Sequence, residues 1–145
     1  MDSELLTKIE ESGLDTAMVY RVMMFEENFI KAARAHDLAV AAAESKSGEY
    51  PKYMFEAGSC AETAYLFYLG VAGKERGKFE KQNPAGLDDT DIDNLLSRIR
   101  RATGHECNEG VVYIVGKCRR FINVRNDFSD ARKAEIANKK FKRDD

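Results

Sequence analysis

The feature that most constrains the fold is a stripe of apolar residues at helical spacing near the end of the chain. Its members follow one another at steps of four, three, four and three residues: Val111, Val115, Cys118, Ile122 and Arg125. Residues separated by three or four positions share one face of an α-helix. The stripe therefore predicts a helix over about 108–128, whose apolar face ends on an arginine and which can resume through SDARKAEIANKK.

The same periodicity recurs through most of the chain, which has only 2 prolines. It predicts helices over about 3–12, 15–45, 51–72 and 91–103, separated by segments that carry glycine or proline. Asp15 or Thr16 is the expected N-cap of the second helix, and Thr90 or Asp91 that of the fourth. Strand signals are weak, so the predicted fold class is all-α, an up-and-down bundle of four to five helices.

The inward faces of these helices follow from the same spacing. For the second helix, which can be continuous or bent, we expect Val19, Val22 or Met23, Phe29 or Ile30, Ala33, Leu38 and Ala41. For the third we expect Ala57, Ala61, Ala64, Tyr68 and Val71. For the fourth we expect Ile92, Leu95, Leu96 and Ile99. The small residues of the third helix allow another helix to approach closely, either inside the chain or across a dimer.

The length and composition indicate one domain, residues 1–145, with 43% hydrophobic residues and a net charge of −2. The acidic balance excludes a general attraction to nucleic acid or anionic membranes, although a local basic region remains. Its members are Arg98, Arg100, Arg101, Lys117, Arg119, Arg120 and Arg125. No apolar run approaches the length of a membrane span, so we expect no membrane contact.

Three cysteines without a CxxC pair, in a chain with 2 histidines, predict neither a disulfide framework nor a zinc site. Cys60 and Cys118 fall among apolar residues and are expected to be buried thiols. We therefore expect a cytoplasmic protein without a metal or another cofactor. Motifs for phosphate-binding loops, serine hydrolases and metalloproteases are missing from the sequence.

One block, residues 37–73, carries a more specific pattern. It contains Asp37-Leu38, then the turn Gly48-Glu49-Tyr50, then an alanine-rich helix with Ala61-Glu62. Further on stand TDIDNLL and FINVRNDFSD. This order and spacing resembles the HEPN superfamily over roughly 37–130. The resemblance leaves residues 1–36 as an N-terminal helical extension and residues 138–145 as a frayed tail.

The resemblance implies a helical bundle, often a homodimer, and in many members a metal-independent ribonuclease. Its signature is an arginine, a polar residue and, a few residues later, a histidine. Arg125 and Asn126 match the first two positions, where arginine stabilises phosphate charge. The histidine is expected between Phe128 and Arg132, and none of the five residues in this window is a histidine. This departure predicts a catalytically degenerate member.

The resemblance also implies partners for Arg125 around a shared groove. Glu62 would face the groove and pair with Arg125, and Asp37 and Asp130 would complete a polar ligand-binding cluster. Each of these residues has a simpler interpretation as part of a solvated helix face. Elsewhere, Arg100 and His105 satisfy an Arg-x4-His spacing literally, which makes His105 an alternative catalytic residue, although it lies in a glycine-bearing break.

Three functions remain open from the sequence. The first is a HEPN-like protein that binds RNA, a nucleotide or a protein partner, in a toxin–antitoxin or phage-defence setting. The second is an active metal-independent endoribonuclease that uses Arg125 with Asp130, or Arg100 with His105. The third is a helical adaptor, inhibitor or immunity protein that acts only through protein–protein binding.

Overall fold

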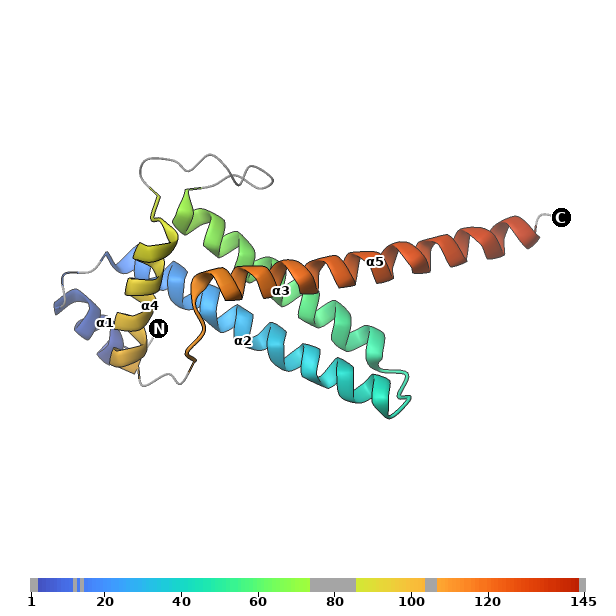
Figure 1. Cartoon of the computed structure of the whole chain (residues 1–145), viewed down its shortest axis with the longest axis horizontal. Helices are drawn as coiled ribbons and strands as arrows, with labels where there is room; N and C mark the ends of the chain where they lie inside the picture. Colours follow the sequence, from blue (N-terminus) through green and yellow to red (C-terminus); the bar gives the residue numbers. More distant parts are fainter. Residues whose placement is uncertain (1–2, 12, 14, 74–85, 104–106, 144–145) are drawn as a thin grey trace.

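The structure is a computed structural model, and it describes residues 3–11, 13, 15–73, 86–103 and 107–143. These residues form five helices: α1 (Ser3–Glu11), α2 (Thr16–Glu44), α3 (Tyr50–Ala72), α4 (Asp89–Thr103) and α5 (Val111–Arg143). No strand occurs in this part of the chain (Figure 1). The predicted all-α class is therefore confirmed. Within the described ranges, no helix is both long enough and apolar enough to cross a membrane.

The centre of the molecule is the antiparallel hairpin of α2 and α3, which α5 crosses (Figure 1). The alanines of α3 are completely buried, as are several residues of α2 opposite them. These buried positions are Val19, Val22, Ala32, Ala39, Ala57, Ala61 and Ala64. Because α2 covers the small-residue face of α3, that face cannot serve as a dimer seam. The alternative of an internal contact is the correct one.

The buried face of α2 is rotated from the predicted one in its second half. It passes through Ala35, Ala39 and Ala42, whereas Leu38 is 50% exposed and Ala41 is exposed. α2 is one continuous helix, so the boundary expected at residue 37 falls inside it. The residues before this boundary supply much of the core.

Side chains at the helix ends explain where the helices begin. Asp15 is the N-cap of α2, as predicted, since its Oδ1 accepts hydrogen bonds from the backbone N–H groups of Ala17 at 3.0 Å and Met18 at 3.4 Å. The prediction for α4 was wrong: its first turn is capped by Asp88, whose Oδ1 accepts from the Asp91 N–H at 2.7 Å. An aspartate just before a helix start is as good a cap as the threonine that follows it, so the sequence alone does not fix the choice.

α4 is tied to two other helices through its acidic first turns. The hydroxyl of Tyr68 on α3 donates to Asp89 Oδ1 at 2.9 Å. Asp93 Oδ1 accepts from the backbone N–H of Val111 at 2.7 Å, which satisfies an orphan donor in the first turn of α5. The predicted inward residues of α4 are all buried: Ile92, Leu95, Leu96 and Ile99.

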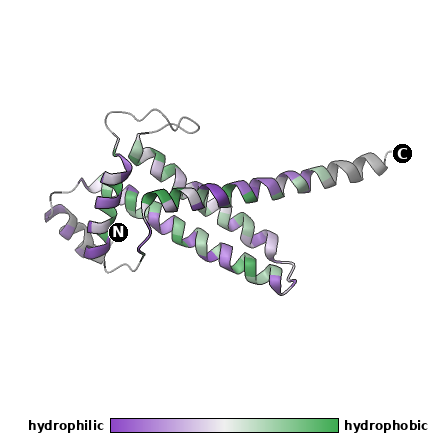
Figure 2. Cartoon of the chain, viewed as in Figure 1, coloured by the Kyte–Doolittle hydropathy of each residue, from purple (hydrophilic) through white to green (hydrophobic). Residues whose placement is uncertain are grey.

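α5 packs its first half on the hairpin and then projects beyond it (Figure 1). Its deepest residues are Val111, Ile114, Cys118 and Phe121. The helix passes Phe128 without a break and runs to Arg143, whereas we expected fraying from residue 138. The part of the projecting helix that Figure 2 colours is mostly hydrophilic.

Candidate functional site

Arg125, the residue that ends the apolar stripe, reaches from α5 to α3. Its Nη2 donates to Glu62 Oε2 at 2.6 Å. Its Nε and Nη2 also donate to Asn126 Oδ1, at 3.1 and 3.0 Å. The side chain of Arg125 is only 16% exposed and that of Glu62 27%. The structure therefore contains the Glu62–Arg125 ion pair with Asn126 beside it, while a ligand-binding role for the three residues stays a prediction.

Gly58, one turn before Glu62 on α3, makes room for this arginine. A Cβ atom built on Gly58 would stand 2.6 Å from Cβ of Arg125 and 2.9 Å from its Cγ. Real carbon atoms do not approach so closely, so any larger residue would push the arginine stem away. Gly58 does not stand out in the sequence, because a glycine inside a helix can have many causes.

The Arg125 guanidinium contacts Glu62 and Asn126 through two of its three nitrogen atoms. A guanidinium carries five N–H donors in a planar fork. The bonds to Glu62 and Asn126 use Nε and Nη2, and among the described residues Nη1 has no hydrogen-bond partner. A fixed, partly buried arginine with an available edge suits an anionic oxygen of a ligand.

Aromatic side chains border this cluster on two sides. The ring of Phe128 meets the rings of Tyr50 and Phe55 edge-on, at centroid distances of 6.2 and 6.0 Å. Two turns before Phe128 on α5, the ring of Phe121 stacks on the ring of His36 of α2, with the centroids 4.7 Å apart. Since Phe55 is 41% exposed, this border offers an aromatic surface to solvent.

The other predicted site residues do not join the cluster. Asp37 on α2 and Asp130 on α5 are exposed, and neither makes a hydrogen bond or ion pair with Arg125, Glu62 or Asn126 in the described part of the chain. His105 lies outside the described residues, so its predicted role is not addressed by the structure. The cluster therefore consists of Arg125, Asn126 and Glu62.

Arg100, the other half of the alternative Arg-x4-His pair, has a structural environment of its own. Its Nε and Nη2 contact Glu26 Oε2 at 2.7 and 2.6 Å, and its Nη2 donates to the carbonyl of Glu109 at 2.7 Å. Glu26 is 4% exposed. These contacts join α2, α4 and the segment that leads into α5. Glu26 was missed as a buried partner, although its position within the apolar run VMMFEENFI was a usable signal.

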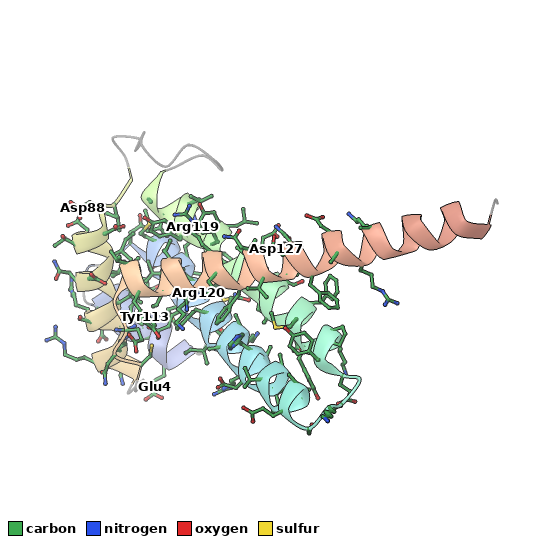
Figure 3. All side chains as sticks on the ribbon, turned by 45° about the vertical axis from the view of Figure 1, so that its right-hand side comes forward. Glu4, Asp88, Tyr113, Arg119, Arg120 and Asp127 are labelled. Atoms are coloured by element: carbon green, nitrogen blue, oxygen red, sulfur yellow. The ribbon has the colours of Figure 1, made fainter. Side chains whose placement is uncertain are left out.

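The basic region of the sequence divides into inward and outward residues. Its two inward arginines, Arg100 and Arg125, each pair with a carboxylate. The outward members include Arg98, Arg101, Arg119 and Arg120, the last two labelled on α5 in Figure 3. The structure therefore does not present the arginines as a single cationic patch.

A cavity of about 460 Å³ lies between α2 and α4, away from Arg125. It is lined by Met23, Glu26, Glu27, Ile30, Lys31, Arg34, Ile99 and Cys107. The described residues contain no group of three or more side chains able to hold a metal ion. Burial raises the pKa of Cys118 to about 12, so this thiol stays protonated near neutral pH.

Comparisons with family models, curated proteins and solved structures find no match to this chain. The class that the fold and the cluster define is an all-α bundle with a partly buried Arg–Glu–Asn group on two crossing helices.

Proposed function

We propose that this chain is a HEPN-like helical protein that binds a phosphate-bearing ligand, either RNA or a nucleotide, at the Arg125 cluster. The observation that carries the proposal is that Glu62 and Asn126 hold the Arg125 guanidinium in place while Nη1 has no partner among the described residues. The resemblance of the sequence to HEPN proteins supports the same position, because Arg125 and Asn126 occupy the Arg-Asn start of the family motif.

The chemistry of the cluster determines the affinity that we expect for a phosphate-bearing ligand. A guanidinium binds phosphate oxygens through short, charge-assisted hydrogen bonds. The carboxylate of Glu62 offsets most of the positive charge, so binding should be weak, on the order of micromolar. The exposed ring of Phe55 beside the cluster can add stacking with a base.

Binding without cleavage follows from the residues after Arg125. Cleavage of RNA without a metal needs a group that transfers protons near neutral pH, usually a histidine. The positions after Asn126 hold no histidine, and Asp130 makes no contact with the cluster in the described structure. A binding role in a toxin–antitoxin or phage-defence setting, with lost catalysis, accounts for this combination.

The proposal is tested by fluorescence anisotropy with a labelled single-stranded RNA and a labelled nucleotide. We expect Arg125→Ala to weaken binding about tenfold, the value of one lost phosphate contact. Arg125→Lys should recover little, because an ammonium cannot span Glu62, Asn126 and a phosphate at once. Arg132→Ala, an exposed arginine seven positions further along α5, should leave binding unchanged.

Other outcomes would replace the proposal. Shortening of the RNA in the presence of a chelator, abolished by Arg125→Ala or by His105→Ala, would establish the ribonuclease alternative. If neither RNA nor nucleotide binds, and a protein partner is retained equally by wild type and Arg125→Ala, the adaptor or inhibitor alternative is correct.

A further inference from the structure

The cavity between α2 and α4 has one face of α2 as its longest wall. Six lining residues come from this face, at alternating steps of three and one: Met23, Glu26, Glu27, Ile30, Lys31 and Arg34. Residues at these steps share one side of a helix, and the first and last of them lie about 16 Å apart along its axis. Ile99 on α4 and Cys107 complete the lining. The volume of about 460 Å³ is within the range of sites that hold small molecules.

The deep part of the cavity is apolar. Ile99 is only 5% exposed, and Met23 and Ile30 are half-buried, so these three side chains form its floor. Each methylene group that a ligand transfers from water to such a surface improves affinity by up to about fourfold. The deep part therefore suits an alkyl chain.

The charged residues of the lining leave one positive charge without a counter-charge. Glu26 pairs with Arg100 at 2.6 Å. Glu27 pairs with Lys31 at 3.5 Å. Arg34, at the exposed end of the wall, has no ion pair among the described residues. Because both carboxylates already have a cation, a positively charged ligand gains little here, whereas the Arg34 guanidinium can bind an anion through charge-assisted hydrogen bonds.

We propose that this cavity binds a small apolar carboxylate, with its alkyl chain between α2 and α4 and its carboxylate against Arg34. The single charge of a carboxylate matches the single uncompensated charge of the lining, whereas a phosphate monoester carries nearly two. Arg125 does not line the cavity. The inference is therefore independent of the ligand proposed for the Arg125 cluster.

Cys107 provides the test, because it lines the cavity and its thiol is free. Iodoacetamide alkylates accessible thiols, and mass spectrometry of the digested protein gives the rate at each cysteine separately. We expect decanoate to slow the alkylation of Cys107, and the concentration that halves the rate gives its Kd. Cys60 is also half-buried but lies on α3 outside the cavity, so its rate should not change. Octanoate, which is two methylene groups shorter, should bind up to about fifteenfold more weakly.

Variants of the lining separate the two parts of the site. Arg34→Gln should weaken decanoate binding about threefold to fivefold, the value of one solvent-exposed charge contact, and should leave the binding of decanol unchanged. Arg21→Gln removes an exposed arginine of the same helix that does not line the cavity, so it should change neither. Ile30→Trp should abolish protection by both compounds, because the indole ring fills the space. Circular dichroism verifies that each variant remains folded.

Four results would overturn the proposal. The first is a wild-type Cys107 whose alkylation rate does not respond to decanoate. The second is equal protection of Cys60 and Cys107, which would show adsorption to exposed apolar surface. The third is protection by decylamine as strong as that by decanoate, because a cation would then bind as well as an anion. The fourth is an Arg34→Gln variant that binds decanoate as tightly as the wild type does.

Discussion

At the scale of single residues, the contact between Gly58 and Arg125 makes a sharp prediction. In an exposed helix position, Gly→Ala gains about 1 kcal/mol of stability. At Gly58 the added methyl group would stand within 3 Å of the Arg125 stem near its backbone, and such overpacking costs about 1–3 kcal/mol. We expect Gly58→Ala to lower the free energy of unfolding by about 1–2 kcal/mol in urea denaturation.

Gly70 on the same helix provides the comparison. It is exposed and a Cβ there would meet nothing within 4 Å, so Gly70→Ala should stabilise by up to about 1 kcal/mol. Adding Arg125→Ala to Gly58→Ala should relieve only part of this cost, because the Cγ atom is removed whereas the Cβ atom of residue 125, 2.6 Å from the added methyl group, remains. Equal effects of the two glycine substitutions would show that Gly58 is not a packing requirement.

At the scale of helices, the Glu26–Arg100 pair joins α2, α4 and the entry to α5. The side chain of Glu26 is 5% exposed and that of Arg100 is 14% exposed. Removing one member leaves a buried charge without its partner, which costs about 3–5 kcal/mol. We expect Glu26→Leu to destabilise the protein by this amount, measured as the free energy of unfolding in urea.

The double variant Glu26→Leu with Arg100→Met separates charge from packing. Replacing both members by apolar residues of similar size is often nearly neutral. The double variant should therefore be more stable than Glu26→Leu alone, with a coupling of at least about 1 kcal/mol in the double-mutant cycle. Strictly additive losses would indicate that the pair contributes through its packing.

The helices themselves were largely predictable, because their periodicity is local. The rotation of each helix was less so. In α5 the predicted stripe ran through Val115 and Ile122, which are half-buried, whereas Ile114 and Phe121 lie deeper. An apolar face is wide enough to admit two stripes one residue apart. Both stripes share Val111, Cys118 and Arg125, and this is why the inward position of Arg125 could be anticipated.

Contacts between distant segments were harder to predict. Glu62 was expected near Arg125 only because a family resemblance joined the two, while Gly58 and Glu26 depend on how helices far apart in sequence cross. The end of α2 shows that even a local feature, the residue at which a helix stops, was hard to predict. Its first residue beyond the cap is Lys46 with φ of 57°, a conformation that glycine favours, whereas the visible sequence signal was Gly48.

At the scale of the whole molecule, stability depends on pH through buried groups whose pKa values are higher in the folded chain than in the unfolded chain. Burial raises the pKa of Cys118 from 9.0 to about 12. The pKa of Tyr68 is also raised, by burial first and then by its hydrogen bond to Asp89. An unfolded chain loses these protons at lower pH than the folded chain does. The stability they contribute is therefore complete below pH 9 and is lost as the pH rises above it.

We predict that the free energy of unfolding falls above pH 9 by up to about 1.4 kcal/mol per pH unit for Cys118, with a further decline from Tyr68 at higher pH. Urea denaturation at intervals from pH 7 upward measures this slope. Cys118→Ala should be less stable at pH 7, because it leaves a cavity, yet its stability should decline less steeply above pH 9. Parallel curves for the two proteins would mean that Cys118 ionises in the folded chain as readily as in the unfolded chain.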